Sequence, residues 1–205
     1  YDRKGEVLLY EMYGEEKREI VDFNKVPTHL KQVILAAEDI NFYKHFGIDF
    51  KALARATLAN LKIMRPIQGG STISQQLIRS SFLTREKTLK RKVREIILTL
   101  ELERKYSKDQ IFDFYLNQVP FGSNAYGVQT ASQTYFQKEV SDIFLEEAAL
   151  LAALIQSPSY LSPYGEHKKE LLQRKDFILD KMAKEGFVSR EEVEKAKGKE
   201  IKIAC

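Results

Sequence analysis

The sequence predicts a mainly α-helical domain that begins with one small β-hairpin. From about residue 28 onward, apolar side chains recur at intervals of three and four, which is the spacing of one buried helix face. Before them, residues 5–23 hold two short apolar runs, Val7–Tyr10 and Ile20–Phe23, with Gly14 between them, as in two strands joined by a turn. At 205 residues the chain is long enough for one domain with a sizeable core, alone or with a small second lobe.

Each helix is predicted from a start signal or from an apolar stripe. The first begins at Pro27-Thr28, and its stripe consists of Leu30, Val33, Ile34 and Ala37. Three more starts have capping-box spacing, namely Thr72 with Gln75, Ser107 with Gln110, and Ser189 with Glu192. A long helix is predicted over about residues 86–105, with a buried stripe of Leu89, Val93, Ile96, Ile97 and Leu100.

The second half of the chain contains the most apolar segment. Residues 146–155 are apolar on nearly every side, which predicts a central buried helix. Ser157-Pro158 and Ser162-Pro163 then predict a loop. From Lys168 to Lys197 the pattern is that of two charged amphipathic helices hinged at Gly186.

Composition narrows the classes of partner. The net charge of +4 suits an anionic substrate or lipid headgroups, and no nucleic-acid-binding motif is present. The single cysteine, Cys205, excludes an internal disulfide and a cysteine-based zinc site, and the three histidines are too far apart to predict a metal site. The longest apolar run, residues 148–155, is far shorter than the roughly 20 residues of a membrane-spanning helix.

Glu38 is the first candidate catalytic residue. It lies four residues after Ile34, so it continues the buried stripe, and it lies near the C-terminal end of its helix. Burial and the helix dipole both raise the pKa of a carboxyl group there, toward the range of a general base. The alternative is a structural carboxylate that is capped by His45 or by a backbone amide and holds a tight turn.

Glu95 is the second candidate, and it shares a helix face with Arg91, while Lys92 lies nearby. An exposed i,i+4 pair of this kind is worth only about 0.3–0.5 kcal/mol. Leu98 and Leu102 on the same face indicate that this face is covered. A covered group of charges favours a functional site over a surface ion pair.

Between the two glutamates, Gly69-Gly70-Ser71-Thr72 predicts a turn followed by free amides at a helix start. Such amides can bind phosphate oxygens, and Gln75 and Gln76 add neutral donors. An ordinary capped helix is the alternative, and the missing Walker lysine excludes a P-loop. Two carboxylates, a helix start and several cations together suit the cleavage of a bond between sugar and phosphate.

Assembled in this order, the motifs resemble those of the peptidoglycan glycosyltransferase (transglycosylase) domains of bacterial class A penicillin-binding proteins and their monofunctional relatives. The pattern E-D-x-x-F-x-x-H-x-G is matched by Glu38, Asp39, Phe42, His45 and Gly47. The pattern G-G-S-T-I-x-Q-Q is matched by residues 69–76, and R-K-x-x-E by Arg91, Lys92 and Glu95. Segments 107–117 and 147–163 resemble the fourth and fifth motifs. The family's usual Lys-Asn is replaced here by Arg79-Ser80.

The resemblance implies a lysozyme-like, two-lobed helical fold, with a larger globular lobe and a smaller membrane-facing lobe around residues 45–80. It implies polymerisation of lipid II onto a growing glycan strand, with release of the lipid diphosphate and inversion at the donor sugar. Glu38 is then the base that activates the acceptor hydroxyl, and Glu95 orients the cations. A diphosphate leaving group needs cations rather than a general acid. Substrate and diphosphate contacts are expected from Lys92, Arg91, Arg79, Ser71, Thr72, Gln76, His45 and Asp39.

The resemblance also implies partners and a location. These are lipid II, the glycan strand, phosphoglycolipid inhibitors of the moenomycin type, and the outer (periplasmic) face of the bacterial cytoplasmic membrane. The basic and apolar stretch 61–67 is expected to contact the membrane through Ile63, Met64 and Ile67. No cofactor is required by the sequence, and dependence on a divalent cation, Mg or Mn, is left open. The chain resembles an excised catalytic domain without the family's transmembrane anchor or transpeptidase domain.

Two other functions fit part of the pattern. A lysozyme-like hydrolase or lytic transglycosylase would also use a buried glutamate, but it would not need Arg91, Lys92 or the helix start at Ser71. A non-enzymatic lipid- or glycan-binding module would fit the mild positive charge, but not two matched glutamates. Turnover of lipid II separates the three.

Overall fold

Helix α7 (Leu145–Ile155) is the centre of the fold, and every residue in it from Glu146 to Ile155 is buried. Its small alanine side chains allow neighbouring helices to approach closely, and α1 (Thr28–Glu38) and α8 (Lys168–Lys184) both pack against it. The same two helices also pack against each other. The central buried helix predicted for 146–155 is confirmed.

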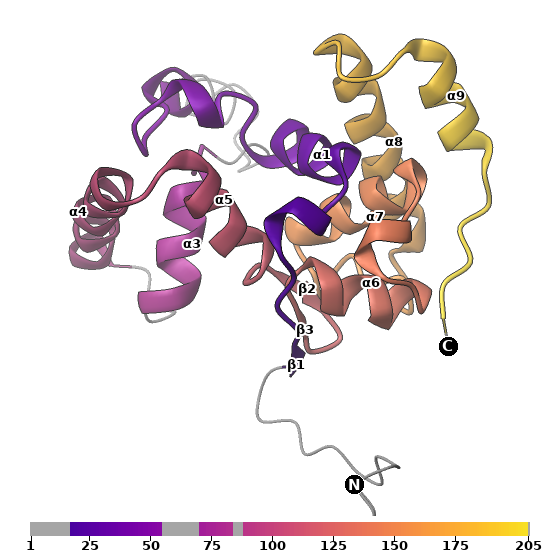
Figure 1. Ribbon diagram of the computed structural model, residues 1–205, viewed down its shortest axis with the longest axis horizontal. Helices are drawn as coiled ribbons and strands as arrows, with labels where there is room; N and C mark the ends of the chain where they lie inside the picture. Colours follow the sequence, from indigo (N-terminus) through magenta and orange to yellow (C-terminus); the bar gives the residue numbers. More distant parts are fainter. Residues whose placement is uncertain (1–16, 55–69, 84–87, 205) are drawn as a thin grey trace, which may run out of the picture.

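A computed structural model describes residues 17–54, 70–83 and 88–204. Within these ranges the structure is mainly helical (Figure 1). Beyond the helices named above, the α-helices are α3 (Ile73–Phe82), α4 (Leu89–Lys105), α5 (Lys108–Leu116), α6 (Val128–Phe136) and α9 (Arg190–Gly198). Residues 50–54 are also helical. Short 3₁₀ turns are η1 (Phe23–Lys25), η2 (Phe42–Lys44) and η3 (Val140–Asp142). Helix α3 packs against both α4 and α5, and α4 lies at the edge of the molecule (Figure 1).

The small sheet differs from the predicted hairpin. Its strands are β1 (Lys17–Arg18), β2 (Pro120–Gly122) and β3 (Ala125–Tyr126), in the order β1-β3-β2. Strand β1 pairs in parallel with β3, which comes from the middle of the chain. The strand predicted at Ile20–Phe23 is wrong, because Asp22 caps η1 by accepting a hydrogen bond from the Asn24 amide. Residues 5–16 of the predicted hairpin lie outside the described residues.

The hairpin that the structure does contain, β2-β3, was not predicted. Ser123 and Asn124 both adopt positive φ between the strands, at +49° and +59°. Asparagine tolerates this left-handed conformation, so a turn signal was present in the sequence. Each strand has only two or three residues, too few to show a period of two.

Helix α4 is inverted relative to the prediction. Its buried residues are the polar side chains of Glu95, Thr99 and Glu103. The stripe predicted to be buried faces outward, with Leu89 88% exposed, Val93 55% and Ile97 56%. The stripe's spacing was correct, but periodicity does not reveal which face meets the core.

The inner face of α4 is polar because it contacts polar groups on its neighbours. Glu103 accepts hydrogen bonds from Ser74 Oγ of α3 (2.5 Å) and Lys108 Nζ of α5 (2.8 Å). Gly47 lies so close to α4 that a Cβ atom there would come within 2.9 Å of Thr99 Cγ2. The division into two lobes around residues 45–80 stays a prediction, because 55–69 lie outside the described ranges.

Gly127 precedes α6 and Gly186 follows α8, and we expect substitution by alanine to destabilise the protein more at the first than at the second. Gly127 precedes α6 with φ +82°, and a Cβ atom there would lie 2.8 Å from the Asn117 carbonyl oxygen. Gly186 follows α8 with φ +77°, and nothing lies within 4 Å of its Cβ position. Left-handed strain alone costs about 1–2 kcal/mol. Gly127→Ala should lower the free energy of unfolding by more than about 2 kcal/mol, and Gly186→Ala by less, in denaturant titrations. Equal losses would contradict the close approach at Gly127.

Candidate active site

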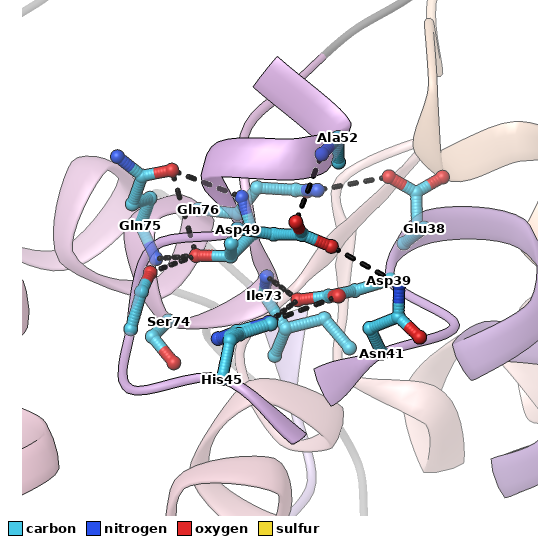
Figure 2. Close-up of polar contacts among 12 residues, drawn as sticks. Glu38, Asp39, Asn41, His45, Asp49, Ala52, Ile73, Ser74, Gln75 and Gln76 are labelled. Carbon is cyan, nitrogen blue, oxygen red and sulfur yellow. Dashed lines mark hydrogen bonds and ion pairs between the residues drawn. The ribbon is translucent and has the colours of Figure 1, made fainter. Parts of the chain in front are cut away.

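Glu38 is the last residue of α1, and its carboxylate lies between α3 and α8. Oε2 accepts a hydrogen bond of 2.9 Å from Gln76 Nε2 of α3 (Figure 2). Oε1 lies 3.7 Å from Arg174 Nη2 of α8. The side chain is 12% exposed. Burial raises the pKa of Glu38 above its ordinary value, as predicted, although Gln76, Arg174, Lys181 and Arg79 oppose the rise.

Gln76 connects Glu38 to a buried tyrosine. Its side-chain Oε1 accepts a hydrogen bond of 3.1 Å from the Tyr115 hydroxyl, so its Nε2 is oriented to donate to Glu38. Burial raises the pKa of Tyr115 well above its usual range, so the phenol remains a donor at neutral pH. In the structure, Tyr115 is therefore the residue that fixes the orientation of Gln76.

Arg174 belongs to the site although the sequence analysis did not single it out. It lies 136 positions after Glu38 (174 − 38), on a helix that packs against α1. Its guanidinium is mostly buried, and burial lowers its pKa. Its charge opposes the effect of burial on Glu38. The sequence did contain a signal for Arg174. An arginine among the apolar positions of an amphipathic helix needs a buried partner.

Asp39 has a different set of partners from its neighbour Glu38. It is 7% exposed, and its carboxylate accepts hydrogen bonds from His45 Nε2 (3.0 Å) and from the backbone amide of Ile73 (3.0 Å) (Figure 2). Ile73 is the first residue of α3, so a protein carboxylate occupies the positive end of that helix. Asp39 and His45 therefore hold the start of α3 in place.

Thr72 was predicted to contact phosphate, and in the structure its polar groups have partners inside the protein, so this contact stays a prediction. The residue is 2% exposed, and its hydroxyl donates to the Gly47 carbonyl oxygen at 2.6 Å. Its amide donates to Gln75 Oε1 at 3.0 Å, which completes a capping box. Asp39 and His45 also have partners inside the protein, and the substrate contacts predicted for them stay predictions. Ser71 is half-buried beside them, and its predicted role stays a prediction.

The Arg-Lys-Glu group on α4 is assembled as predicted. Glu95 is 1% exposed and pairs with both Lys92 Nζ and Arg91 Nη1, the latter at 3.4 Å. Lys92 remains 42% exposed while Arg91 is 18% exposed. With two cations on its carboxylate, Glu95 orients them and is poorly placed to transfer a proton.

Helix α3 connects the two charged groups. Its residue Gln76 donates a hydrogen bond to Glu38, and Arg79 lies in its last turn. The helix also packs against α4. The charge of Arg79 is near enough to oppose the rise in the Glu38 pKa. Gly69 and the predicted membrane contacts Ile63, Met64 and Ile67 lie outside the described residues.

An open hollow of about 550 Å³ borders Arg174 on the side of α8. Tyr160 and Phe177 line it with exposed aromatic rings, and Gln156 and Gln173 line it with amides. Aromatic faces and amides are the groups with which proteins bind uncharged sugars. Within the described ranges, no three His, Cys, Asp or Glu side chains gather to hold a metal ion.

Chemically, this arrangement holds one buried carboxylate with a raised pKa beside cations of α3 and α8, with the cations of α4 on the other side of α3. Such a carboxylate can accept a proton, and the cations of α3 and α4 can stabilise a leaving anion. The carboxylate of Glu95 is already paired with Arg91 and Lys92.

The chain is similar to known proteins over most of its length. The family model described as Transglycosylase matches residues 5–183. Penicillin-binding protein 1A of Aquifex aeolicus is 45% identical over 203 residues, which are 99% of this chain and 28% of that protein. Penicillin-binding protein 1F of Bacillus subtilis is 42% identical over 186 residues, 91% of this chain and 26% of that protein. The chain thus spans about a quarter of the length of these relatives.

Among solved structures, penicillin-binding protein 1A from Haemophilus influenzae matches with a TM-score of 0.56 and 23% identity. The match covers 93% of this chain and 19% of that one. The predicted fold class, a mainly helical lysozyme-like domain, is confirmed. In the described part of the chain, no helix is long and apolar enough to cross a membrane.

The pairing of Glu38 with Arg174 predicts a change in titration. Arg174→Gln removes a cation that opposes the effect of burial, so the pKa of Glu38 should rise further above its ordinary value. The measurement is a carbon NMR titration of the labelled Glu38 carboxyl group. Lys184→Gln, which removes an exposed cation from the same helix, should leave that titration unchanged. An unaltered pKa in Arg174→Gln would contradict the ion pair.

Proposed function

The chain belongs to the transglycosylase family, and we propose that it is a peptidoglycan glycosyltransferase domain that polymerises lipid II into glycan strands. The observation that carries the proposal is the environment of Glu38. A buried carboxylate with a raised pKa is held by Gln76, with the cations of α3 and α4 on neighbouring elements.

In the proposed reaction, the acceptor is lipid II and the donor is the growing strand linked to a lipid diphosphate. Glu38 takes the proton from the acceptor hydroxyl as that oxygen forms a bond to the donor's anomeric carbon. The bond from this carbon to the diphosphate breaks, and the diphosphate leaves with the electron pair. Arg91, Lys92 and Arg79 stabilise its charge. Attack opposite to the leaving group inverts the anomeric centre.

A glycan-cleaving hydrolase is less compatible with the site. Cleavage of a sugar–sugar bond needs a protonated acid for the leaving oxygen and a second carboxylate on the other side of the sugar. Glu95 pairs with two cations, so its carboxylate oxygens are already occupied by internal partners. The side chain of Lys92 is 42% exposed, so it can contact a substrate. In a hydrolase it would have no leaving anion to bind.

The further partners follow from this proposal. The hollow beside Arg174 is placed to hold sugars of the glycan strand, because one of its lining residues contacts the base. Phosphoglycolipid inhibitors of the moenomycin type would use the same cations as the donor diphosphate. A lipid-linked substrate places the domain at the membrane surface, on the outer face of the cytoplasmic membrane in the parent protein.

The reaction is tested with labelled lipid II in detergent. The parental chain should form polymer, and Glu38→Gln should lose at least about 10²-fold in rate because the amide cannot accept the proton. Because base catalysis needs ionised Glu38, the parental rate should fall as pH drops below its raised pKa. Arg174→Gln should shift this acidic limb to higher pH. Fragmentation of preformed glycan strands without polymer formation would instead support the hydrolase.

Lys92 is tested by the same assay. Lys92→Ala should lower kcat at least about tenfold because the leaving diphosphate loses a cation. Lys92→Arg should recover part of the rate, since the charge is kept while its geometry changes. Lys90→Ala, two positions earlier on α4 and exposed, is the matched control and should retain the parental rate. If Lys92→Ala and Lys90→Ala behave alike, Lys92 is only a surface cation.

A further inference from the structure

Two aromatic rings near the start of α8 are stacked on one another beside the hollow that borders Arg174. Tyr160 lies on the loop that follows α7, and His167 is the N-cap residue of α8. Their ring centroids are 3.8 Å apart and their planes differ by 21°. His167 Nδ1 also lies 3.5 Å from Glu170 Oε1, so the imidazole is held at its face and at its edge.

This support fixes an aromatic ring that a ligand can reach. An exposed tyrosine loses rotamer freedom when a ligand immobilises it, and that loss weakens binding. Tyr160 is already ordered by its stack with His167, yet 51% of the residue stays exposed. An ordered, exposed aromatic ring is a surface on which the apolar C–H face of a sugar ring can pack, because the face of an aromatic ring carries partial negative charge.

The neighbouring face of α8 supplies further groups of the same hollow. Gln173, Arg174 and Phe177 follow Glu170 by three, four and seven positions, so the four share one helix face. All of them line the hollow together with Tyr160. Phe177 is 62% exposed. The hollow thus combines two exposed aromatic rings with an amide and two opposite charges.

The charges of the hollow favour a neutral ligand. Its lining contains one cation, Arg174, and one anion, Glu170. The cations proposed to stabilise the leaving diphosphate lie on α3 and α4 instead. A phosphate would gain little in the hollow, because the attraction of Arg174 is opposed by the repulsion of Glu170. An uncharged ligand such as a sugar is not subject to this opposition.

We propose that Tyr160, supported by His167, is a stacking platform for one N-acetylated hexose, and that Gln173 binds polar groups of the same sugar. The identity of the sugar rests on the proposed function, because peptidoglycan strands are built from N-acetylated hexoses. Its position follows from Arg174, which lines the hollow and lies 3.7 Å from Glu38. This subsite gives the domain affinity for uncharged oligosaccharides that carry neither a lipid nor a diphosphate.

The chain has three histidines, so the imidazole of His167 is a resolvable reporter of the platform. In an NMR titration of the isotope-labelled chain with the tetramer of N-acetylglucosamine, the His167 ring signals should shift and saturate. His29, which contacts the Ile143 carbonyl oxygen, is the internal control and should not shift. Cellotetraose, which lacks acetamido groups, and inorganic diphosphate should shift His167 far less. His167 signals that the tetramer leaves unchanged, or that respond equally to either comparison ligand, would overturn the proposal.

Variants at two exposed tyrosines test the stacking surface. Tyr160→Ala should weaken binding of the tetramer about tenfold, and Tyr160→Phe should retain most of the affinity because the ring face is kept. Tyr164→Ala is the matched control, since Tyr164 is 53% exposed on the same loop and is not among the residues that line the hollow. Affinities are measured from backbone amide signals of α8, with circular dichroism as the check of folding. Equal affinities of Tyr160→Ala and Tyr164→Ala would contradict the platform.

The support from His167 is tested separately. His167→Ala should weaken binding of the tetramer, but less than Tyr160→Ala, because the tyrosine must then be ordered by the ligand. His167→Phe keeps a planar ring against Tyr160 and should recover the affinity. If His167→Ala binds like the parent, the tyrosine needs no support and the proposed role of His167 is wrong.

These outcomes are separable from the proposed reaction. A parental chain that binds the tetramer but forms no polymer from lipid II would contradict the proposed function and leave the subsite standing. A parental chain that polymerises lipid II while the His167 signals do not respond to the tetramer would keep the function and remove the subsite. If the His167 signals shift with protein concentration in the absence of sugar, this face binds a second copy of the chain and the proposal fails.

Discussion

The geometry of the site depends on the buried carboxylate of Asp39. It joins the end of α1 to the start of α3 by accepting hydrogen bonds from the Ile73 amide and from His45. Hydrogen bonds to a charged group are worth about 1.5–3 kcal/mol each, and a carboxylate at a helix N-terminus is further stabilised by the helix dipole. Because Gln76 lies one turn into α3, this junction sets where its amide meets Glu38.

Two adjacent carboxylates therefore have separate tasks. Asp39 accepts hydrogen bonds from His45 and from the Ile73 amide, and it serves as a structural anchor. Glu38 has one neutral donor at hydrogen-bond distance and a guanidinium at 3.7 Å, so burial prevails and its pKa rises. Paired carboxyl groups in different environments are a recurrent way to obtain one fixed charge and one proton acceptor. Here the difference arises from the direction in which each side chain leaves the end of α1.

Much of the helical fold was predictable because its signals are local. The capping boxes at Thr72, Ser107 and Ser189 are all present at the starts of α3, α5 and α9, and α7 is buried throughout. The orientation of α4 was not predictable from its own residues. Its apolar and polar faces have equally regular spacing, and the choice between them is made by Ser74, Lys108 and Gly47 on other elements.

The site shows the same limit. Glu38, Gln76, Arg91, Lys92 and Glu95 belong to recognisable motifs, whereas Arg174 joins them only through packing. Conversely, Thr72 and His45 belong to motifs but are used internally, which a spacing cannot reveal. A helix start predicts that amides need a partner, and it does not say whether that partner is a ligand phosphate or the protein's own carboxylate.

The position of Arg174 depends in turn on the core. Helices α1 and α8 both pack on α7, whose alanines at 148, 149, 152 and 153 are fully buried. Larger side chains there would push α1 and α8 outward, and the 3.7 Å separation of Glu38 and Arg174 would grow. The attraction between unit charges falls with distance, so the proton affinity of Glu38 would change without any substitution at the site. The small residues of α7 therefore influence the proton affinity of Glu38 through the positions of α1 and α8.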